Sequence, residues 1–570
     1  MSSRRRFLTL FPAALAAGAS GRALAEQQGA EAGRVSKAAL NCAEDVIGLD
    51  FTDAEEEMML RGVNNNLTSY ETLRRLAIPH DTEPAIHFTP YLPGRAPTGR
   101  STPNAKIKLS RQPALPKPSR LEDVAFWPVT ALARLIARRE ISSTDLTKMY
   151  LARLKAIGPK LFAVVTLTEE LALRQAAAAD RDIRAGRYRG PLHGIPWGAK
   201  DLFATKGIRT TWGAKPYEHQ VIDADATVVE RLRDAGAVLV AKLSMGSLAQ
   251  GGVWFGGSTR NPWNLERSSS GSSAGPGAAT AAGLVGFSLG TETRGSIVSP
   301  AAENGVAGLR PTYGRVSRYG AMPLSWTMDK VGPMCRTVED CAIAFNAIYG
   351  SDGRDTTVVD APFVWTPDTP ISRYRIGYVK AEIEDIPASL NDEQRKTRTA
   401  MNALMMDAVA AFRKMGARVE PVALPSFPAN ALNFILSAEA AASFDELTRT
   451  KGIDTLTAQG PGDWPNTFRA SRFVPAVEYI RAQQARTLLM REWDTLMQGY
   501  DAILSPNSSA SLGATNLTGH PSLTMKVGFL ENRPRSLMLT GKLYDEATIL
   551  RLGLAFESAT DWDAMHPKVG

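Results

Sequence analysis

Residues Ser268–Gly275 read SSSGSSAG, and a run of small residues follows over Gly277–Gly290 before the chain continues as TETRGS to Ser296. The composition alone is typical of a flexible linker. However, the run that follows over Ala278–Leu289 is apolar, and small residues allow backbones to approach closely inside a fold. We therefore predict an ordered segment, with a buried helix or a helix–strand pair over Ala278–Leu289.

Two common motifs contain glycine and serine in a similar pattern. A phosphate-binding loop requires a lysine after the glycines, and none is present. A hydrolase nucleophile elbow requires GxSxG, which Gly271–Gly275 satisfies with Ser273 as nucleophile and His520 or His566 as its base. An elbow must also follow a strand, whereas Asn261–Ser270 is polar and interrupted. Ser273 is therefore a poor nucleophile of this kind.

A third interpretation accounts for more residues. The segment ends in RGSIVSPA at Arg294–Ala301, which resembles the closing motif of the amidase signature family. Further stretches resemble the family in the family's order, from about residue 119 to the end. They are GIPWGAKD at 194–201, VAKLSM at 240–245, GVAGLRPT at 305–312, GPM at 332–334, NLTGHP at 516–521 and YDEA at 544–547.

The fold class is also indicated by the order of elements. Strand-like runs such as Ala237–Ala241 alternate with helical segments such as Ala224–Ala235, which predicts an α/β fold with a sheet covered by helices on both faces. The resemblance implies one large layered domain with a mixed sheet over residues 119–570. Residues 351–480 have a more helical texture, and we expect them to cap the site.

The resemblance implies a Ser–Ser–Lys triad, with Ser296 as nucleophile, Ser272 as bridging serine and Lys200 as base. In the family the bridging serine follows a cis peptide bond, here Gly271–Ser272. A serine hydroxyl needs an adjacent base, and a lysine serves only when burial keeps it neutral. Lys200 follows the apolar run Ile195–Trp197, which is consistent with burial.

The resemblance also implies an oxyanion hole formed by the backbone N–H groups of Thr293, Arg294, Gly295 and Ser296. Two residues depart from the family pattern. Arg294 stands where a glycine is usual, and its side chain could narrow the pocket, bind a substrate carboxylate or point outward. Glu292 replaces an aspartate and could shift a supporting hydrogen bond.

The implied activity is hydrolysis of a carboxamide C–N bond through an acyl-enzyme, releasing ammonia or an amine, with a small-molecule or peptide amide as substrate. Esters and carbamates suit the same chemistry. No cofactor is expected. The alternatives are a glutaminase-type subunit of a tRNA-dependent amidotransferase and a non-catalytic binding protein on the same fold. A homodimer is an open question.

Composition excludes several other classes. The net charge is +8, but four arginines among the first 25 residues supply half of it, and no long basic tract remains to bind nucleic acid. The three cysteines, Cys42, Cys335 and Cys341, form no CxxC motif, and the six histidines are scattered. The sequence therefore predicts no metal site, and it leaves a Cys335–Cys341 bridge undecided.

The N-terminus has the features of an export signal. Ser3–Leu8 reads SRRRFL, an apolar stretch follows over Phe7–Ala17, and Ala23–Ala25 provides small residues for cleavage after Ala25. We expect residues 1–25 to be a twin-arginine signal peptide and the mature protein to be periplasmic or secreted. No later run of about 18 apolar residues predicts a stable membrane span.

Residues 26–118 are predicted to be an N-terminal extension, both helical and extended. Asp53–Arg61 and Ser69–Leu76 each have the pattern of a short helix with a capping residue. A proline-rich stretch follows up to Pro118, and proline favours extended chain. We expect this extension to pack on the main body or at a subunit contact.

Overall fold

The computed structural model describes residues 34–74, 82, 86–116 and 118–569, and the chain divides into two compact units, 1–79 and 80–570. The expected signal segment, residues 1–25, lies outside the described residues, so its cleavage stays a prediction. Within the described ranges, none of the helices has the length and apolar character needed to cross a membrane.

Over residues 34–74, the part of the smaller unit that the structure describes, the chain forms the helices α2 (Lys37–Ile47) and α3 (Asp53–Arg74). The prediction of two short helices after residue 53 is wrong, because α3 runs through both of them without a break. The hydroxyls of Thr68 and Ser69 donate to the carbonyls four residues earlier, so residues that resemble a helix start continue the helix instead.

The larger unit is built on one mixed sheet of eleven strands, in the order β1-β3-β2-β8-β10-β9-β14-β15-β13-β11-β12. β2 pairs in parallel with both β3 and β8, whereas β10 is antiparallel to β8 and β9. The strands are β1 (Val164–Leu167), β2 (Pro196–Lys200), β3 (Val238–Leu243), β8 (Phe287–Glu292), β9 (Ala307–Arg310), β10 (Lys330–Cys335), β11 (Arg375–Val379), β12 (Arg418–Val422), β13 (Ala502–Pro506), β14 (Ser522–Leu530) and β15 (Arg533–Gly541).

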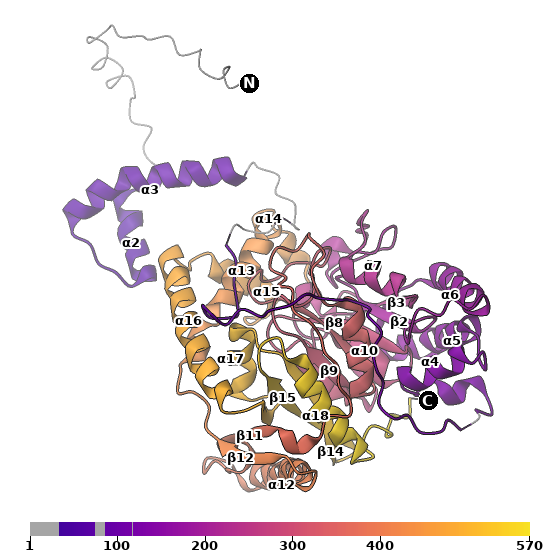
Figure 1. Ribbon diagram of the computed structural model, residues 1–570. Helices are drawn as coiled ribbons and strands as arrows, with labels where there is room; N and C mark the ends of the chain where they lie inside the picture. Colours follow the sequence, from indigo (N-terminus) through magenta and orange to yellow (C-terminus); the bar gives the residue numbers. More distant parts are fainter. Residues whose placement is uncertain (1–33, 75–81, 83–85, 117, 570) are drawn as a thin grey trace, which may run out of the picture. The chain divides into compact units, whose positions relative to one another are not determined.

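Both faces of this sheet are covered, as the sequence predicts. Alternate residues of β3 belong to different buried clusters, with Leu239 in one and Val238 and Val240 in the other. Helices flank the strands throughout Figure 1. They are α4 (Val129–Ala137), α5 (Ser143–Leu161), α6 (Glu169–Arg184), α7 (Thr227–Asp234), α8 (Ala274–Ala281), α9 (Val298–Asn304), α10 (Val338–Ile348), α11 (Lys380–Ile383), α12 (Asp392–Lys414), α13 (Phe434–Ser443), α14 (Asp445–Arg449), α15 (Trp464–Ser471), α16 (Ala476–Gln498), α17 (Ala510–Thr518) and α18 (Glu546–Ser558).

The Gly/Ser segment forms the helix–strand pair that its small residues predict, as α8 followed by β8. Close packing explains the glycines. A Cβ at Gly277 would lie 2.8 Å from the Asn304 amide nitrogen, and one at Gly290 would lie 2.7 Å from the Ser273 hydroxyl. The polar stretch before it forms a separate two-stranded hairpin, β6 (Arg260–Asn261) with β7 (Asn264–Ser268).

Residues 86–116 form an extended strap that belongs to the larger unit. The Ser101 hydroxyl donates to the Ala361 carbonyl at 3.1 Å, and the Ser110 hydroxyl donates to the Glu339 carboxylate at 2.7 Å. This strap therefore packs on the main body, as expected for the proline-rich stretch. The domain division at residue 118 stays a prediction.

Residues 351–480 contribute strands to the sheet, and their role as a cap over the site stays a prediction. β11 and β12 pair in parallel with each other and extend the sheet at one edge, with α12 between them in sequence. Both strands are short. β12 reads RVEPV, and its charged residues and proline resemble a loop, whereas four of the five residues of β11 are buried. α13 to α15 follow them in sequence, and α13 contacts α15.

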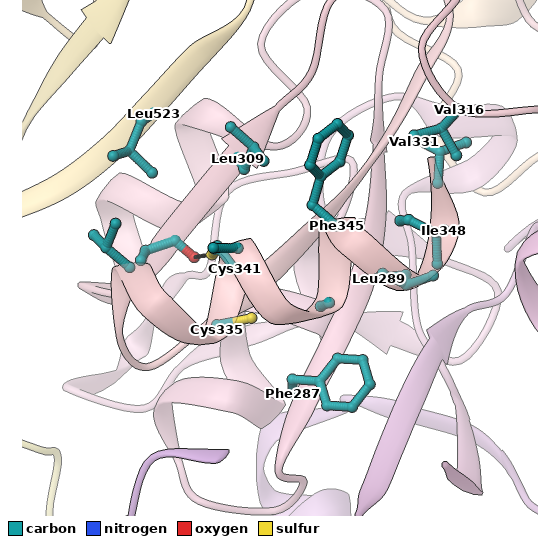
Figure 2. Close-up of a cluster of buried hydrophobic side chains, with 14 of the residues drawn as sticks. Phe287, Leu289, Leu309, Val316, Val331, Cys335, Cys341, Phe345, Ile348 and Leu523 are labelled. Atoms are coloured by element: carbon teal, nitrogen blue, oxygen red, sulfur yellow. Dashed lines mark hydrogen bonds between the residues drawn. The ribbon is translucent and has the colours of Figure 1, made fainter. Parts of the chain in front are cut away.

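The three cysteines are free, so no Cys335–Cys341 bridge is present. Figure 2 shows Cys335 and Cys341 among the apolar side chains that pack on the central strands, including Phe287 and Phe345. Both thiols are buried, and burial raises the pKa of Cys335 well above its usual value. These cysteines act as core residues.

Candidate active site

Three segments meet where β2 and β8 end. Lys200 is the last residue of β2, and Glu292 is the last residue of β8. Because β2 and β8 are parallel neighbours, their carboxyl ends lie at the same edge of the sheet. The loop Gly271–Ser273, which precedes α8, supplies the third segment.

Lys200 is fully buried, and its ammonium contacts hydroxyl groups rather than a carboxylate. Nζ lies 2.9 Å from Ser272 Oγ, 3.1 Å from Ser273 Oγ and 2.8 Å from Thr291 Oγ1. Burial lowers the pKa of Lys200 to about 7, against the opposing charges of Asp329 and Glu292. A large fraction of this lysine is therefore neutral near pH 7.

Other lysines of this region differ in their surroundings. Lys206 and Lys215 are exposed and lie beside the carboxylates of Asp223 and Glu218. Among the described residues, the geometry required of a buried base is thus found at Lys200 and not at these neighbours.

The Gly271–Ser272 peptide bond is cis, and Ser272 is buried. The backbone here is tightly enclosed, because a Cβ at Gly271 would lie 1.8 Å from the Gly251 carbonyl oxygen. The Ser272 carbonyl accepts from the Gly246 amide at 3.3 Å. These contacts hold the Ser272 hydroxyl against Lys200.

Ser273 is tied to the sheet. Its hydroxyl donates to the Thr291 carbonyl at 3.1 Å and accepts from the Thr291 amide at 3.2 Å. The histidines considered as its base have other partners: His520 Nδ1 lies 2.7 Å from the Thr518 hydroxyl, and His566 stacks on Phe126. The structure does not bring an elbow triad together at Ser273.

The turn Thr293–Ser296 connects β8 to α9 and carries the predicted nucleophile. Ser296 is partly exposed, its carbonyl accepts from the Ser273 amide at 3.2 Å, and Gly295 has φ +99°. Among the residues that the structure describes, the backbone N–H groups of Thr293, Arg294, Gly295 and Ser296 have no hydrogen-bond acceptor. Unpaired donors beside a serine hydroxyl suit a developing oxyanion.

The buried Glu292 carboxylate holds the turn through hydrogen bonds and an ion pair. Its carboxylate accepts from the Ile297 and Val298 amides at 2.8 and 2.9 Å, and it also binds Arg310 and Asn516. Although burial opposes ionisation, Arg310 and the amides keep the pKa of Glu292 below its usual value. The longer acid thus supports the start of α9.

Asp329 fixes the other side of the turn. Its carboxylate accepts from the Thr293 hydroxyl at 2.5 Å and from the amides of Leu324 and Ser325 at 2.8 and 2.9 Å. Sequence reasoning missed Asp329 as well as Thr291. Thr291 lies inside the quoted motif, whereas Asp329 lies outside every motif quoted above.

A small cavity of about 50 Å³ lies beside the turn, at Thr291 and Thr293. Trp326 lines it and is partly exposed. The rest of the lining is mixed: the apolar residues are Leu202, Ala249, Ala321, Met322, Pro323, Leu324 and Val331, and the charged residues are Arg318, Asp329, Lys330, Arg354 and Asp355. The cavity therefore offers both apolar surface and charged groups beside the turn.

Comparisons with known proteins agree with the motifs. The family model described as Amidase matches residues 145–514. The A subunit of the glutamyl-tRNA(Gln) amidotransferase from Roseiflexus castenholzii is 37% identical over 490 residues, which covers 77% of this chain and 97% of the relative. The subunit of the same name from Heliobacterium modesticaldum is 35% identical over 486 residues, with 76% and 97% coverage.

Solved structures give the same result for the fold. The native peptide amidase from Stenotrophomonas maltophilia superimposes with a TM-score of 0.68 at 31% identity, covering 77% of this chain and 98% of that chain. The family match spans the ends of β2 and β8 and the turn after β8. The chain belongs to the amidase signature family, and it is an amide-hydrolysing enzyme built on a single α/β domain.

Proposed function

We propose that this protein hydrolyses carboxamides through an acyl-enzyme on Ser296, with Ser272 as proton relay and Lys200 as base. The observation that carries the proposal is the fully buried Lys200 amine, which contacts hydroxyls and has a pKa lowered to about 7 by burial. A neutral amine has a lone pair for the Ser272 proton. Its two N–H groups then face Thr291 Oγ1 and Ser273 Oγ.

The first half of the cycle moves one proton and forms one bond. The Ser296 hydroxyl gives its proton to Ser272 Oγ as Ser272 gives its own to Lys200 Nζ, and Ser296 Oγ bonds to the amide carbon. Among the described residues the Ser296 hydroxyl has no hydrogen-bond partner, so substrate binding must close it on Ser272. Such contacts commonly tighten only with substrate bound.

The second half returns the proton. The negative oxygen of the tetrahedral intermediate receives hydrogen bonds from the free N–H groups of residues 293–296. The C–N bond breaks as the leaving nitrogen takes the proton from Lys200 through Ser272. Water then attacks the Ser296 ester by the same relay and releases the acid. Esters and carbamates fit this sequence of steps.

Labelling with a fluorophosphonate, read by intact mass, tests this assignment. We expect one adduct on the wild type, none on Ser296→Ala, and strongly slowed labelling of Lys200→Ala. Ser273→Ala is the matched control, because it removes the neighbouring hydroxyl that the elbow alternative requires. An adduct that survives in Ser296→Ala and maps to Ser273 would contradict the proposal.

A second candidate is a glutaminase-type subunit of a tRNA-dependent amidotransferase, which the names of the curated relatives favour. The discriminating measurement is ammonia release by the purified chain from glutamine and from simple amides. Turnover of simple amides by the chain alone supports the hydrolase. Ammonia release confined to glutamine, and dependent on added partner subunits and glutamyl-tRNA, supports the amidotransferase.

We also propose that the protein is exported, on the basis of Arg4, Arg5 and the Ala23–Ala25 site. Cell fractionation of the full chain is expected to give a periplasmic or secreted product shortened after Ala25. Replacing Arg4 and Arg5 with lysine is expected to retain the uncleaved chain in the cytoplasm. A full-length wild-type product confined to the cytoplasm would reject export.

A further inference from the structure

The turn formed by residues 246–252 packs against the loop that carries Ser272. The Gly246 amide donates to the Ser272 carbonyl at 3.3 Å, and a Cβ at Gly271 would lie 1.8 Å from the Gly251 carbonyl oxygen. Both contacts join backbone to backbone, so no flexible side chain separates the two segments. A displacement of the turn must therefore displace the Ser272 loop as well.

The backbone of this turn is in an unfavourable conformation. Leu248 and Ala249 have φ of +47° and +65°, in the left-handed region that residues with a side chain rarely adopt. Two such residues in succession persist only where surrounding contacts enforce the conformation. One of these contacts is the hydrogen bond from the Leu248 amide to the Trp212 carbonyl at 3.0 Å. The position of the turn thus depends on segments outside it.

A second set of contacts reaches the turn from the first residues of α15. Gln250 Oε1 accepts from the Trp464 amide at 2.9 Å, and Gln250 Nε2 donates to the Gly462 carbonyl at 2.9 Å. The Trp464 indole donates to the Leu248 carbonyl at 2.8 Å. Both ends of the Gln250 carboxamide, and one of the two left-handed residues, are therefore bonded to the start of this helix.

The start of α15 also requires these bonds. The first amides of a helix have no carbonyl partner within the helix. Asp463 occupies the N-cap position of α15, but its side chain accepts no capping hydrogen bond. Gln250 supplies an acceptor for the Trp464 amide instead, from 214 residues earlier in the chain. The turn and the helix therefore stabilise each other.

α15 is itself firmly packed. Trp464 is buried and stacks on Phe468 with ring centroids 4.9 Å apart, and Phe468 stacks on Phe444 at 5.6 Å. α13 contacts α15, and Phe444 directly follows α13 (Figure 1). The turn is thus held by a packed unit of residues 351–480 rather than by a single side chain.

We propose that Gln250 is a positioning residue: by joining the turn to α15, it holds the Ser272 hydroxyl at 2.9 Å from Lys200 Nζ. This inference rests on the proposed function, in which Ser272 relays the proton of the nucleophile. Lys200 also contacts the hydroxyls of Ser273 and Thr291, so its own position does not depend on the turn. Loss of the Gln250 contacts is therefore expected to move the relay and not the base.

The test measures the rate of fluorophosphonate labelling at Ser296 together with kcat and KM for a simple amide. Gln250→Ala is expected to lower the labelling rate and kcat by about 10- to 100-fold with little change in KM, because small displacements from a reactive geometry reduce rates on this scale. Gln250→Glu retains an acceptor for α15 and loses the donor, and it is expected to be intermediate. Asn466→Ala is the matched control, because this exposed carboxamide of α15 donates to the Pro461 carbonyl within its own segment.

A double-mutant cycle distinguishes positioning of Ser272 from general support of the fold. In Ser272→Ala the relay hydroxyl is already absent, so adding Gln250→Ala should change the residual labelling rate by less than about threefold. A residue that merely stabilises the fold would lower the rate by the same factor in both backgrounds. Thermal melts of each variant confirm that folded proteins are compared. If Gln250→Ala does not fold, Gln250→Glu takes its place in the cycle.

The outcomes separate this inference from the function on which it rests. A wild type labelled at Ser296 and a Gln250→Ala protein labelled just as fast overturn the role of Gln250 alone. Equal losses of rate in the wild-type and Ser272→Ala backgrounds overturn it as well. A folded wild type that is not labelled at all removes the proposed nucleophile and this inference with it.

Discussion

Lys200 and Lys242 lie on adjacent parallel strands, and both are fully buried, yet their surroundings differ. Lys242 Nζ lies 3.3 Å from the Asp201 carboxylate, and it donates to the Phe203 carbonyl and the Thr210 hydroxyl at 2.8 and 2.6 Å. Lys200 contacts three hydroxyls and no carboxylate. At the same edge of the sheet, Lys242 is therefore held as a structural cation by Asp201, whereas Lys200 is held as a reactive amine by hydroxyl groups.

Electrostatics follow from these contacts. Burial lowers the pKa of both lysines, but for Lys242 the adjacent Asp201 opposes the shift through its charge and a hydrogen bond. For Lys200 the opposing charges of Asp329 and Glu292 act only from a distance, and its pKa falls to about 7. The pKa of Lys200 is thus low enough for the amine to act as a base near pH 7.

The largest expected effect is on activity, from Lys200→Met. We expect kcat/KM to fall by about 10⁴-fold or more, because the serine loses its base. Thermal stability should stay at or above that of the wild type, since the change removes a buried amine that has no countercharge. Steady-state amidase rates and a thermal melt measure both. A variant with near wild-type kcat/KM would assign the base elsewhere.

Lys242→Met should show the opposite pattern. It leaves the Asp201 carboxylate buried without its partner, and we expect a loss of about 3–5 kcal/mol of unfolding free energy. Rates per folded molecule should change far less than in Lys200→Met. Urea unfolding gives the free energy. As a control, the double variant Lys242→Met/Asp201→Asn is expected to recover part of the lost unfolding free energy. A Lys242→Met protein as stable as the wild type would contradict a structural role for Lys242.

Sequence patterns predicted the elements that have a strong and local signature. β3 and the α8–β8 pair follow from apolar runs and small residues, and the motifs pointed to Lys200, Ser272 and Ser296 as site residues. The short strands β11 and β12 were not predicted. β12 is an edge strand with a charged and proline-containing sequence, whereas β11 is a short buried strand that pairs with both β12 and β13. Likewise, the continuous helix α3 was not predicted, because the hydroxyls of Thr68 and Ser69 donate to carbonyls within the helix instead of capping a new one.

Contacts between distant residues could not be predicted in this way. Thr291 meets Lys200 only because β2 and β8 are neighbours in a sheet whose order does not follow the sequence. Asp329 precedes β10, which pairs with β8, and this places it against Thr293. To predict these contacts one needs the order of the strands in the sheet, and the spacing of residues within one segment does not give that order.

The pH dependence sharpens the contrast between the two lysines. If neutral Lys200 is the active form, kcat/KM falls about tenfold per pH unit below about 7 and levels off above it. Stability gives an independent readout. The folded-state pKa is below that of an unfolded lysine, so above about pH 7 the unfolded state binds more protons, and stability rises with pH by up to about 1.4 kcal/mol per unit.

Lys200→Met should lack this contribution to the stability profile. Its unfolding free energy relative to the wild type is therefore greatest near pH 7 and decreases toward pH 10. Urea unfolding of both proteins at several pH values measures the difference. A constant difference across that range would contradict a lowered pKa at Lys200, whatever the rate profile shows.

The smallest expected effect comes from Asp329→Asn, which removes a distant charge that raises the pKa of Lys200. The asparagine oxygen can still accept from the Leu324 and Ser325 amides, and its NH₂ group can donate to the Thr293 hydroxyl, so the turn is retained. We expect the acidic limb of kcat/KM to move to lower pH by less than about one unit. A limb that moves to higher pH would mean that Asp329 does not act on Lys200 through its charge, because losing a negative charge can only favour the neutral amine.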